Sequence, residues 1–238
     1  MSTLSINWKL SHGNFTKLVA RLRAVAARPL ALLLAGSLLA LVAFAGPVQA
    51  QAPADTVLVV GDSLSAEYGL KRGTGWVPLL EKQLVQERKS VKVVNASISG
   101  DTTSGGRSRL PALLTQHKPS VVVVELGGND ALRGLPLDMT EANIAAMVQA
   151  SKKAGAKVLI VGMQVPPNYG GAYAATFSGL FTKVAKAEKV ALVPFFLKGI
   201  ADVDDSASHF QADRIHPNEQ SQARMLANVW PELKKLLK

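Results

Sequence analysis

A serine, a histidine and an aspartate stand where they could together carry out acyl transfer. Ser63 follows an apolar run in the segment "GDSLS", and Asp213 and His216 lie three residues apart in "DRIHPN". A serine hydroxyl is a weak nucleophile until a neighbouring base removes its proton. An imidazole titrates near neutrality, and a carboxylate on its second ring nitrogen fixes its tautomer. We therefore predict Ser63 as the nucleophile, His216 as its base and Asp213 as the group that orients the base.

Acyl transfer also needs hydrogen-bond donors for the negative oxygen of the tetrahedral intermediate. The sequence offers three: the backbone N–H of Ser63, the backbone N–H of Gly100 in "SISGDTTSGG", and the side-chain amide of Asn129 in "GGND". A glycine at position 100 has no β-carbon, so we expect its backbone to approach the substrate closely. These three groups form the predicted oxyanion hole.

Each of these residues also has a simpler structural interpretation. Ser63 fits a helix cap, Asn129 fits a turn, and His216 fits a surface position ahead of a proline. Taken together these interpretations are weaker, because four separate segments would have to bring polar groups to one place by chance. The catalytic interpretation is therefore favoured.

The other histidines do not indicate a metal site. His209 is the competing candidate for the base, and His117 is better explained as a charge near a helix end. No two histidines are four residues apart, and the chain has no cysteine, which excludes a thiol nucleophile and any cysteine-based metal site. The glycine-containing turns lack a Walker lysine and a dinucleotide fingerprint. We expect neither a cofactor nor a metal.

Five short β-branched runs, which alternate with longer helical patterns, must position these residues. The runs cover residues 56–60, 91–98, 120–126, 156–163 and 190–196. Helical spacing of apolar residues covers 75–88, 140–154, 172–188 and a last segment after Asn218, which Pro231 is expected to kink or interrupt. Near-continuous Val, Ile and Leu runs are typical of strands covered on both faces.

This alternation predicts an α/β fold with a parallel sheet between two layers of helices. In such sheets, ligands bind beyond the carboxyl ends of the strands. The segments that hold the candidate residues follow the first, second, third and fifth runs. We therefore expect them to meet at one edge of the sheet.

The first fifty residues have the order of a secretory signal. Five basic residues precede the first acid, Asp55, and the apolar segment "LALLLAGSLLALVAFAG" (30–46) carries no charge. Val48 and Ala50 are the small residues that a signal peptidase requires. An uncleaved membrane anchor is the alternative, but the apolar run is short for a span and a cleavage-like site follows it. We expect cleavage near Ala50, export to the periplasm or beyond, and one domain over 51–238.

Cleavage changes the charge that the working protein carries. It leaves 22 basic residues against 17 acidic ones, a net charge of +5 in place of +10. The remaining basic residues are scattered and form no aromatic-rich stripe, so we expect no nucleic-acid partner and at most a weak contact with a membrane surface. The remaining 188 residues fit a single domain with a sizeable core, which we expect to be a monomer.

Four segments in order resemble the sequence blocks of the SGNH, or GDSL, hydrolases. They are "GDSLS" (61–65), "NASISGDT" (95–102), "GGND" (127–130) and "DRIHPN" (213–218). The stretches "RLPALLTQHKP" and "VELGGNDALRG" resemble the periplasmic acyl-CoA thioesterase I/lysophospholipase/arylesterase group. The resemblance extends over nearly all of residues 55–237. It implies a flavodoxin-like three-layer sandwich with a five-stranded parallel sheet, the same triad and oxyanion residues, and no metal or organic cofactor.

Two segments and one acidic residue are expected to bear on substrate specificity. The acyl chain is expected near "LRGLPL" (132–137) and "VPPNYGGAY" (165–173). Glu67 stands where close relatives often have glycine, and its carboxylate is interpreted either as a surface charge or as an influence on substrate preference.

The sequence thus predicts an exported serine esterase or thioesterase that hydrolyses aryl esters, acyl thioesters and lysophospholipids through an acyl-enzyme. Two alternatives remain open. One is a carbohydrate O-acetyl esterase with the same fold. The other is a non-catalytic module, built on the same scaffold, that binds a lipid or a glycan.

Overall fold

Each of the five apolar runs forms a strand, and the strands pair in one parallel sheet. The computed structural model describes residues 55–87 and 89–237. Its strands are β1 (Asp55–Gly61), β2 (Val91–Asn95), β3 (Val121–Glu125), β4 (Lys157–Val161) and β5 (Ala191–Val193). They lie in the order β2-β1-β3-β4-β5. The predicted five-stranded parallel sheet is confirmed.

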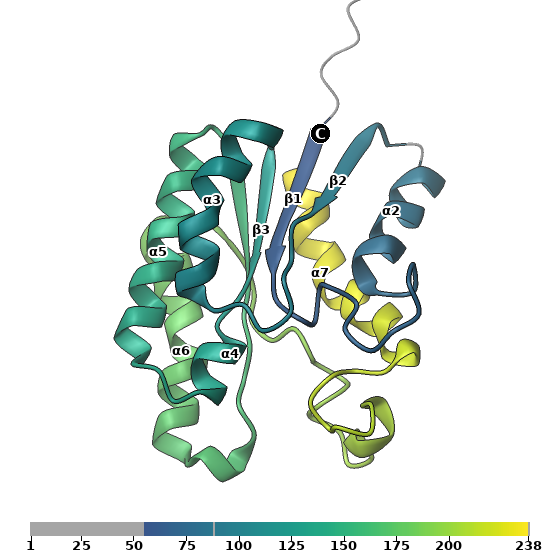
Figure 1. Ribbon diagram of the computed structural model, residues 1–238, viewed down its shortest axis with the longest axis vertical. Helices are drawn as coiled ribbons and strands as arrows, with labels where there is room; N and C mark the ends of the chain where they lie inside the picture. Colours follow the sequence, from purple (N-terminus) through teal and green to yellow (C-terminus); the bar gives the residue numbers. More distant parts are fainter. Residues whose placement is uncertain (1–54, 88, 238) are drawn as a thin grey trace, which may run out of the picture. The chain divides into compact units, whose positions relative to one another are not determined.

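Helices cover both faces of the sheet and complete the three layers (Figure 1). One face carries α3 (Thr103–His117), α5 (Leu137–Lys153) and α6 (Gly171–Glu188), and the other carries α2 (Trp76–Gln86) and α7 (Gln222–Leu236). The connections contain a short helix, α4 (Gly128–Leu132), and the 3-10 turns η1 (Pro167–Tyr169), η2 (Ser206–His209) and η3 (Glu219–Ser221). The predicted α/β architecture is therefore confirmed as well.

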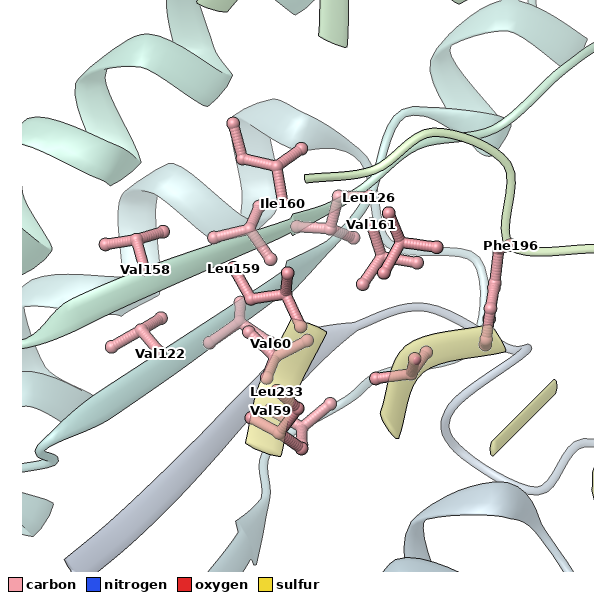
Figure 2. Packing of buried hydrophobic residues seen from close by; sticks show 14 of the residues in the cluster. Val59, Val60, Val122, Leu126, Val158, Leu159, Ile160, Val161, Phe196 and Leu233 are labelled. Atoms are coloured by element: carbon pink, nitrogen blue, oxygen red, sulfur yellow. The ribbon is translucent and has the colours of Figure 1, made fainter. Parts of the chain in front are cut away.

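The core surrounds the two central strands. Residues 57–60 of β1 and 121–124 of β3 are all valine or leucine and are at most 1% exposed. Figure 2 shows side chains of β1, β3 and β4 together with Phe196 and with Leu233 from α7. Full burial of each such side chain is worth roughly 1.5–3 kcal/mol. The well-packed sheet thus supports the loops at its carboxyl edge.

Two strands, β2 and β5, end three residues earlier than predicted, and each has a local cause. β2 stops at Asn95 because the side-chain oxygen of Asn95 accepts the Ser97 amide at 3.1 Å and closes a turn. β5 stops at Val193 because Pro194, which follows it, has no N–H to donate to a strand ladder.

Two helices begin where the sequence shows no helical pattern. α3 begins in "TSGGRSR", which lacks apolar periodicity, and Thr102 caps it by accepting the Gly105 amide at 3.3 Å. The "GGND" segment, whose composition suits a turn, instead forms the beginning of α4. In both cases, hydrogen bonds donated by backbone amides fix the start of the helix, and such bonds need no pattern of apolar residues in the sequence.

The structure describes only one of the two units into which contacts divide the chain. These units are residues 1–52 and 53–238. The predicted signal peptide, 1–50, lies outside the described residues. Among the helices that are described, none combines the length and the apolar character needed to cross a membrane.

Of the two expected effects of Pro231 on the last helix, a kink or an interruption, the interruption is wrong, because α7 continues through it. Pro231 lies on the exposed side of α7, while Met225, Val229 and Leu233 on the other side are buried. Burial of that apolar face outweighs the backbone hydrogen bond that a proline cannot donate.

Replacing Pro231 with alanine should therefore stabilise the protein. Alanine restores the missing donor and is favoured over proline inside a helix by up to about 3 kcal/mol, while the unfolded chain regains roughly 0.4–1 kcal/mol of conformational entropy. We expect the free energy of unfolding in urea to rise by about 1–2 kcal/mol. A fall would mean that the helix needs the proline for its path across the sheet.

Candidate active site

The residues predicted to do chemistry come from separate connections at the carboxyl edge of the sheet. Ser63 follows β1, Gly100 follows β2, Asn129 lies in α4 just after β3, and Asp213 and His216 lie in the long connection between β5 and α7. This edge lies at the lower side of Figure 1, where the arrow of β1 points. The fold thus brings together groups as much as 153 positions apart in the sequence.

Ser63, His216 and Asp213 form a continuous chain of contacts at hydrogen-bond distance. The Ser63 Oγ lies 2.9 Å from His216 Nε2, and His216 Nδ1 lies 2.7 Å from Asp213 Oδ2. A carboxylate beside Nδ1 favours the tautomer with its proton on that nitrogen, which leaves Nε2 free to accept the serine proton. The arrangement can therefore convert the hydroxyl into a nucleophile.

A tight turn fixes Asp213 beside the imidazole. Its Oδ1 accepts the amides of Ile215 and His216, both at 3.0 Å, and the intervening Arg214 adopts a left-handed conformation with φ 57°. Burial raises the pKa of the Asp213 carboxyl, but the hydrogen bonds from these amides and from the imidazole outweigh it and lower the pKa to about 2. Asp213 is therefore charged at neutral pH and can stabilise a protonated His216.

Three amide groups are available as donors at this edge. Within the described residues, neither the Ser63 nor the Gly100 backbone N–H donates to a protein acceptor. The Asn129 Nδ2 donates to Asp62 Oδ2 at 3.0 Å, which uses one of its two N–H groups. The structure thus leaves each predicted oxyanion donor with an N–H to offer.

The glycine at position 100 has a backbone angle that gives a reason for glycine independent of any substrate. Its φ is 78°, in the left-handed region that glycine adopts without steric cost. A β-carbon there would meet nothing nearer than the Arg133 Nη2, at 3.5 Å. Arg133 also donates to the Gly100 carbonyl at 2.7 Å, so this peptide is held in place from the side of α4.

Asp62, directly before the predicted nucleophile, is buried and holds one of the predicted oxyanion donors, Asn129. It is 3% exposed, and its Oδ1 accepts the Leu64 amide at 3.0 Å while its Oδ2 accepts from Asn129. Desolvation raises its pKa to about 6 against the opposing effect of these hydrogen bonds. Asp62 therefore fixes the orientation of the Asn129 amide relative to the Ser63 turn.

Glu125, the last residue of β3, is buried beneath the same turn. It is 2% exposed, and its Oε2 accepts the Ser65 hydroxyl at 2.7 Å and the Asp62 amide at 3.3 Å. The Ser65 Oγ in turn accepts the Trp76 indole N–H at 3.0 Å. Burial raises the pKa of Glu125 well above its usual value, and the nearby Asp62 charge raises it further.

The sequence analysis missed both buried acids, although a signal for them exists. Each carboxyl stands at the end of a continuous apolar run, in "VVGD" and "VVVE". Asp and Glu are almost never fully buried unless they have partners. An acid at the carboxyl end of a buried strand therefore indicates a hydrogen-bonded group beneath a site.

The Glu67 carboxylate has a structural role that neither interpretation from the sequence includes. Its Oε1 accepts the amides of Gly73 and Gly75, at 2.9 and 2.7 Å, so the carboxylate closes the loop ahead of α2. Its φ is 59°, a conformation that glycine adopts readily and most residues avoid. The left-handed backbone gives a physical reason for glycine at this position, and the two hydrogen bonds give one for glutamate.

The competing histidine is not part of the triad geometry. His209 Nε2 lies 3.8 Å from Asp205 Oδ1 and makes no contact with Ser63, and His117 is the last residue of α3. Over residues 55–87 and 89–237, no cluster of three or more histidine, aspartate or glutamate side chains could hold a metal ion.

Exposed apolar side chains gather on the connections at the carboxyl edge of the sheet. Of the eight large apolar residues that are exposed in the described part of the chain, Val85 lies on α2 and Met139 lies in the first turn of α5. The other six lie in these connections and are Tyr68, Ile98, Leu132, Leu135, Tyr169 and Ile215. Leu132, Leu135 and Tyr169 belong to the two segments expected to contact an acyl chain. A group of exposed apolar residues at one edge is typical of a binding surface.

Comparisons with known proteins show which hydrolases the chain is similar to. Residues 59–224 match the model of the GDSL-like lipase/acylhydrolase family. The esterase TesA of Pseudomonas aeruginosa is 54% identical over 187 residues, which are 79% of this chain and 92% of that protein. The thioesterase 1/protease 1/lysophospholipase L1 of Escherichia coli K12 is 44% identical over 171 residues, or 72% of this chain and 79% of that protein. A crystal structure of TesA matches with a TM-score of 0.74 and 54% identity, over 77% of this chain and 100% of that one.

Replacing Glu125 with glutamine should flatten the pH dependence of stability. The native pKa of Glu125 is above its unfolded value, so the native state binds more protons over the interval between them and loses stability as the pH rises through it. Glutamine keeps an oxygen for Ser65 and cannot ionise. We expect the free energy of urea unfolding to fall less between pH 5 and pH 8 in the variant than in the wild type. Exposed Glu81 on α2, changed to glutamine, serves as the control, and equal slopes for wild type and Glu125→Gln would contradict the prediction.

Proposed function

The chain belongs to the GDSL-like lipase/acylhydrolase family and is a hydrolase of ester bonds, and we propose that Ser63, His216 and Asp213 are its catalytic triad. The observation that carries this proposal is the 2.9 Å separation between Ser63 Oγ and His216 Nε2. A general base must lie within hydrogen-bond reach of the proton that it removes. His216 meets that condition and His209 does not.

In the first half of the proposed reaction, Ser63 Oγ attacks the carbonyl carbon of the substrate while His216 Nε2 takes the hydroxyl proton. The charge that develops on the carbonyl oxygen is met by the Ser63 and Gly100 amides and by the free N–H of Asn129. The tetrahedral intermediate then breaks its bond to the alcohol or thiol, which leaves with the proton from His216. The acyl group remains as an ester on Ser63.

Water completes the proposed cycle. His216 takes a proton from a water molecule as its oxygen attacks the acyl-serine carbonyl, and the same amides stabilise the second tetrahedral intermediate. Collapse releases the carboxylic acid, and His216 returns its proton to the Ser63 oxygen. Asp213 stays ionised throughout and stabilises the protonated imidazole, as its lowered pKa supports.

For substrates, we propose acyl thioesters, lysophospholipids and aryl esters. The similar Escherichia coli protein is named a thioesterase and lysophospholipase, and the similar Pseudomonas protein is named an esterase. The exposed Leu132, Leu135 and Tyr169 supply apolar surface for an acyl chain next to the site. Each methylene that such a surface takes from water contributes about 0.8 kcal/mol, which supports acyl chains rather than acetyl groups alone.

We also propose that the protein is exported and works as a monomer in the periplasm after losing residues 1–50. The basic, apolar and small-residue order of that segment supports export. Mass spectrometry of the protein recovered from the periplasm of an expressing cell tests it. We expect the mature chain to begin near Gln51, and recovery of full-length protein from the membrane fraction would contradict the proposal.

Replacing Ser63 with alanine should abolish hydrolysis while the fold remains. We expect the turnover of an aryl ester to fall by at least about 10⁴-fold, as when a triad serine is removed from other serine hydrolases. Ser178→Ala, on α6, is the matched control and should keep wild-type turnover. Retained turnover in Ser63→Ala would overturn the serine mechanism.

A substrate panel on the wild type then tests the substrate proposal separately. We expect hydrolysis of acyl thioesters, lysophospholipids and aryl esters, with rates that depend on acyl length. Hydrolysis confined to acetylated sugars would overturn the proposed substrates and leave the triad in place. It would favour the carbohydrate esterase that the sequence leaves open.

A further inference from the structure

The predicted nucleophile and base lie on two segments that the sheet does not hold together directly. The nucleophile loop, residues 62–75, connects β1 to α2, and the histidine loop, residues 206–218, precedes α7. The hydrogen bond between Ser63 and His216 joins them, but the proposed reaction breaks that bond in each turnover. Other contacts must therefore keep the two loops in register.

The side chain of Gln211 reaches from the histidine loop to the nucleophile loop. Its Nε2 donates to the Tyr68 carbonyl at 2.9 Å and to the Pro217 carbonyl at 3.3 Å. Its backbone N–H donates to the His216 carbonyl at 2.8 Å, and its own carbonyl accepts the Arg214 amide at 2.9 Å. One residue thus connects the nucleophile loop with the backbone on both sides of the His216 peptide.

Tyr68, which Gln211 holds, contacts both members of the reacting pair. Its amide donates to the Ser63 carbonyl at 3.3 Å. Its ring lies against the His216 ring, with centroids 4.4 Å apart and planes tilted by 37°. A shift of the Tyr68 backbone would therefore move the surface against which the imidazole rests.

The residue after Tyr68 leaves room for this contact. A β-carbon on Gly69 would collide with the Gln211 Oε1, and the φ of Gly69 is 70°. The close approach of the Gln211 amide to the nucleophile loop thus depends on a glycine at position 69.

A second glutamine secures the other end of the histidine loop. Buried Gln222 donates to the Asn218 and Pro217 carbonyls at 3.1 and 3.4 Å, and its Oε1 accepts the Trp76 amide at 3.1 Å. The histidine loop is therefore anchored at the start of α2 without Gln211. Loss of Gln211 should loosen the position of His216 and leave the fold in place.

We propose that Gln211 is a positioning residue for the proposed triad: its amide holds the nucleophile loop, through Tyr68, at the distance from His216 that proton transfer requires. This inference rests on the proposed function. A misplacement of about 1 Å in reacting groups can reduce turnover roughly a hundredfold. The effect acts on the reaction of bound substrate, because, in the described part of the chain, Gln211 makes no hydrogen bond with Leu132, Leu135 or Tyr169, the residues proposed to hold the acyl chain.

The test compares Gln211→Ala and Gln211→Glu with the wild type. Glutamate keeps the size of the side chain but turns an acceptor toward two carbonyl oxygens, so both side-chain hydrogen bonds are lost. We expect kcat for an aryl ester, and the rate of labelling by a serine-reactive phosphonate, to fall about 10- to 100-fold. KM should stay within about twofold, and labelling should still reach one phosphonate per chain. Gln149→Ala is the matched control, because the Gln149 Nε2 also bridges two elements, donating to Glu188 Oε1 at 2.7 Å.

The stoichiometry of labelling separates positioning from a loss of folded protein. The proposal is overturned if only a fraction of the variant chains is labelled and that fraction reacts at the wild-type rate. It is also overturned if every variant chain is labelled at the wild-type rate. If neither Gln211 variant folds, Gly69→Ala displaces the same amide, and a wild-type labelling rate in that variant would overturn the proposal. A wild type that the phosphonate does not label, together with an active Ser63→Ala, would instead overturn the proposed function and this inference with it.

Discussion

The register of β1 against β3 is the constraint on which the site depends, because it brings two strands to an end at one level. Gly61 lies opposite Glu125, so the residues after β1 and those after β3 leave the sheet side by side. A β-carbon on Gly61 would come within 2.6 Å of Glu125 Oε2, so glycine permits this contact. From that common level, Glu125 holds Ser65 and Asp62 holds Asn129. Sheet pairing thus sets the separation between Ser63 and one of its proposed oxyanion donors.

The same constraint has a cost in stability. Asp62 and Glu125 are buried close together, and burial raises the pKa of both carboxyls. A buried acid that holds its proton, or that ionises against a neighbouring charge, is less favourable than an apolar residue of similar size. These two destabilising acids lie where β1 and β3 end, while the strand interiors a few residues away are entirely apolar. Such an arrangement is common where orientation of a reacting group competes with stability.

Local patterns in the sequence predict the parts of this structure that rest on local physics. Apolar runs identify the five strands, and the polar segments that follow them identify the sheet edge where Ser63, Gly100, Asn129, Asp213 and His216 are found. The end of α3 near His117 is expected, but its start escapes prediction because capping by Thr102 leaves no apolar periodicity. The contact between Gln211 and the nucleophile loop escapes it for a different reason. The Gln211 amide meets a carbonyl 143 residues away, and no spacing in the sequence encodes such a pair.

The proposed catalytic groups therefore differ in how the fold holds them. β5 pairs only with β4, at the far edge of the sheet from β2, so residues 194–218 must return toward β1 before α7 begins. No strand pairing fixes the register of His216 against Ser63, in contrast to that of Asn129. Side-chain amides take over this role. The Gln222 side chain accepts the Trp76 N–H at the start of α2, and the Gln211 side chain donates to the Tyr68 carbonyl. Hydrogen bonds of this kind are individually modest, about 1 kcal/mol each. The geometry of proton transfer thus depends on a few contacts that contribute little to global stability. The position of Asn129, by contrast, is set by the pairing of β1 with β3 in the core.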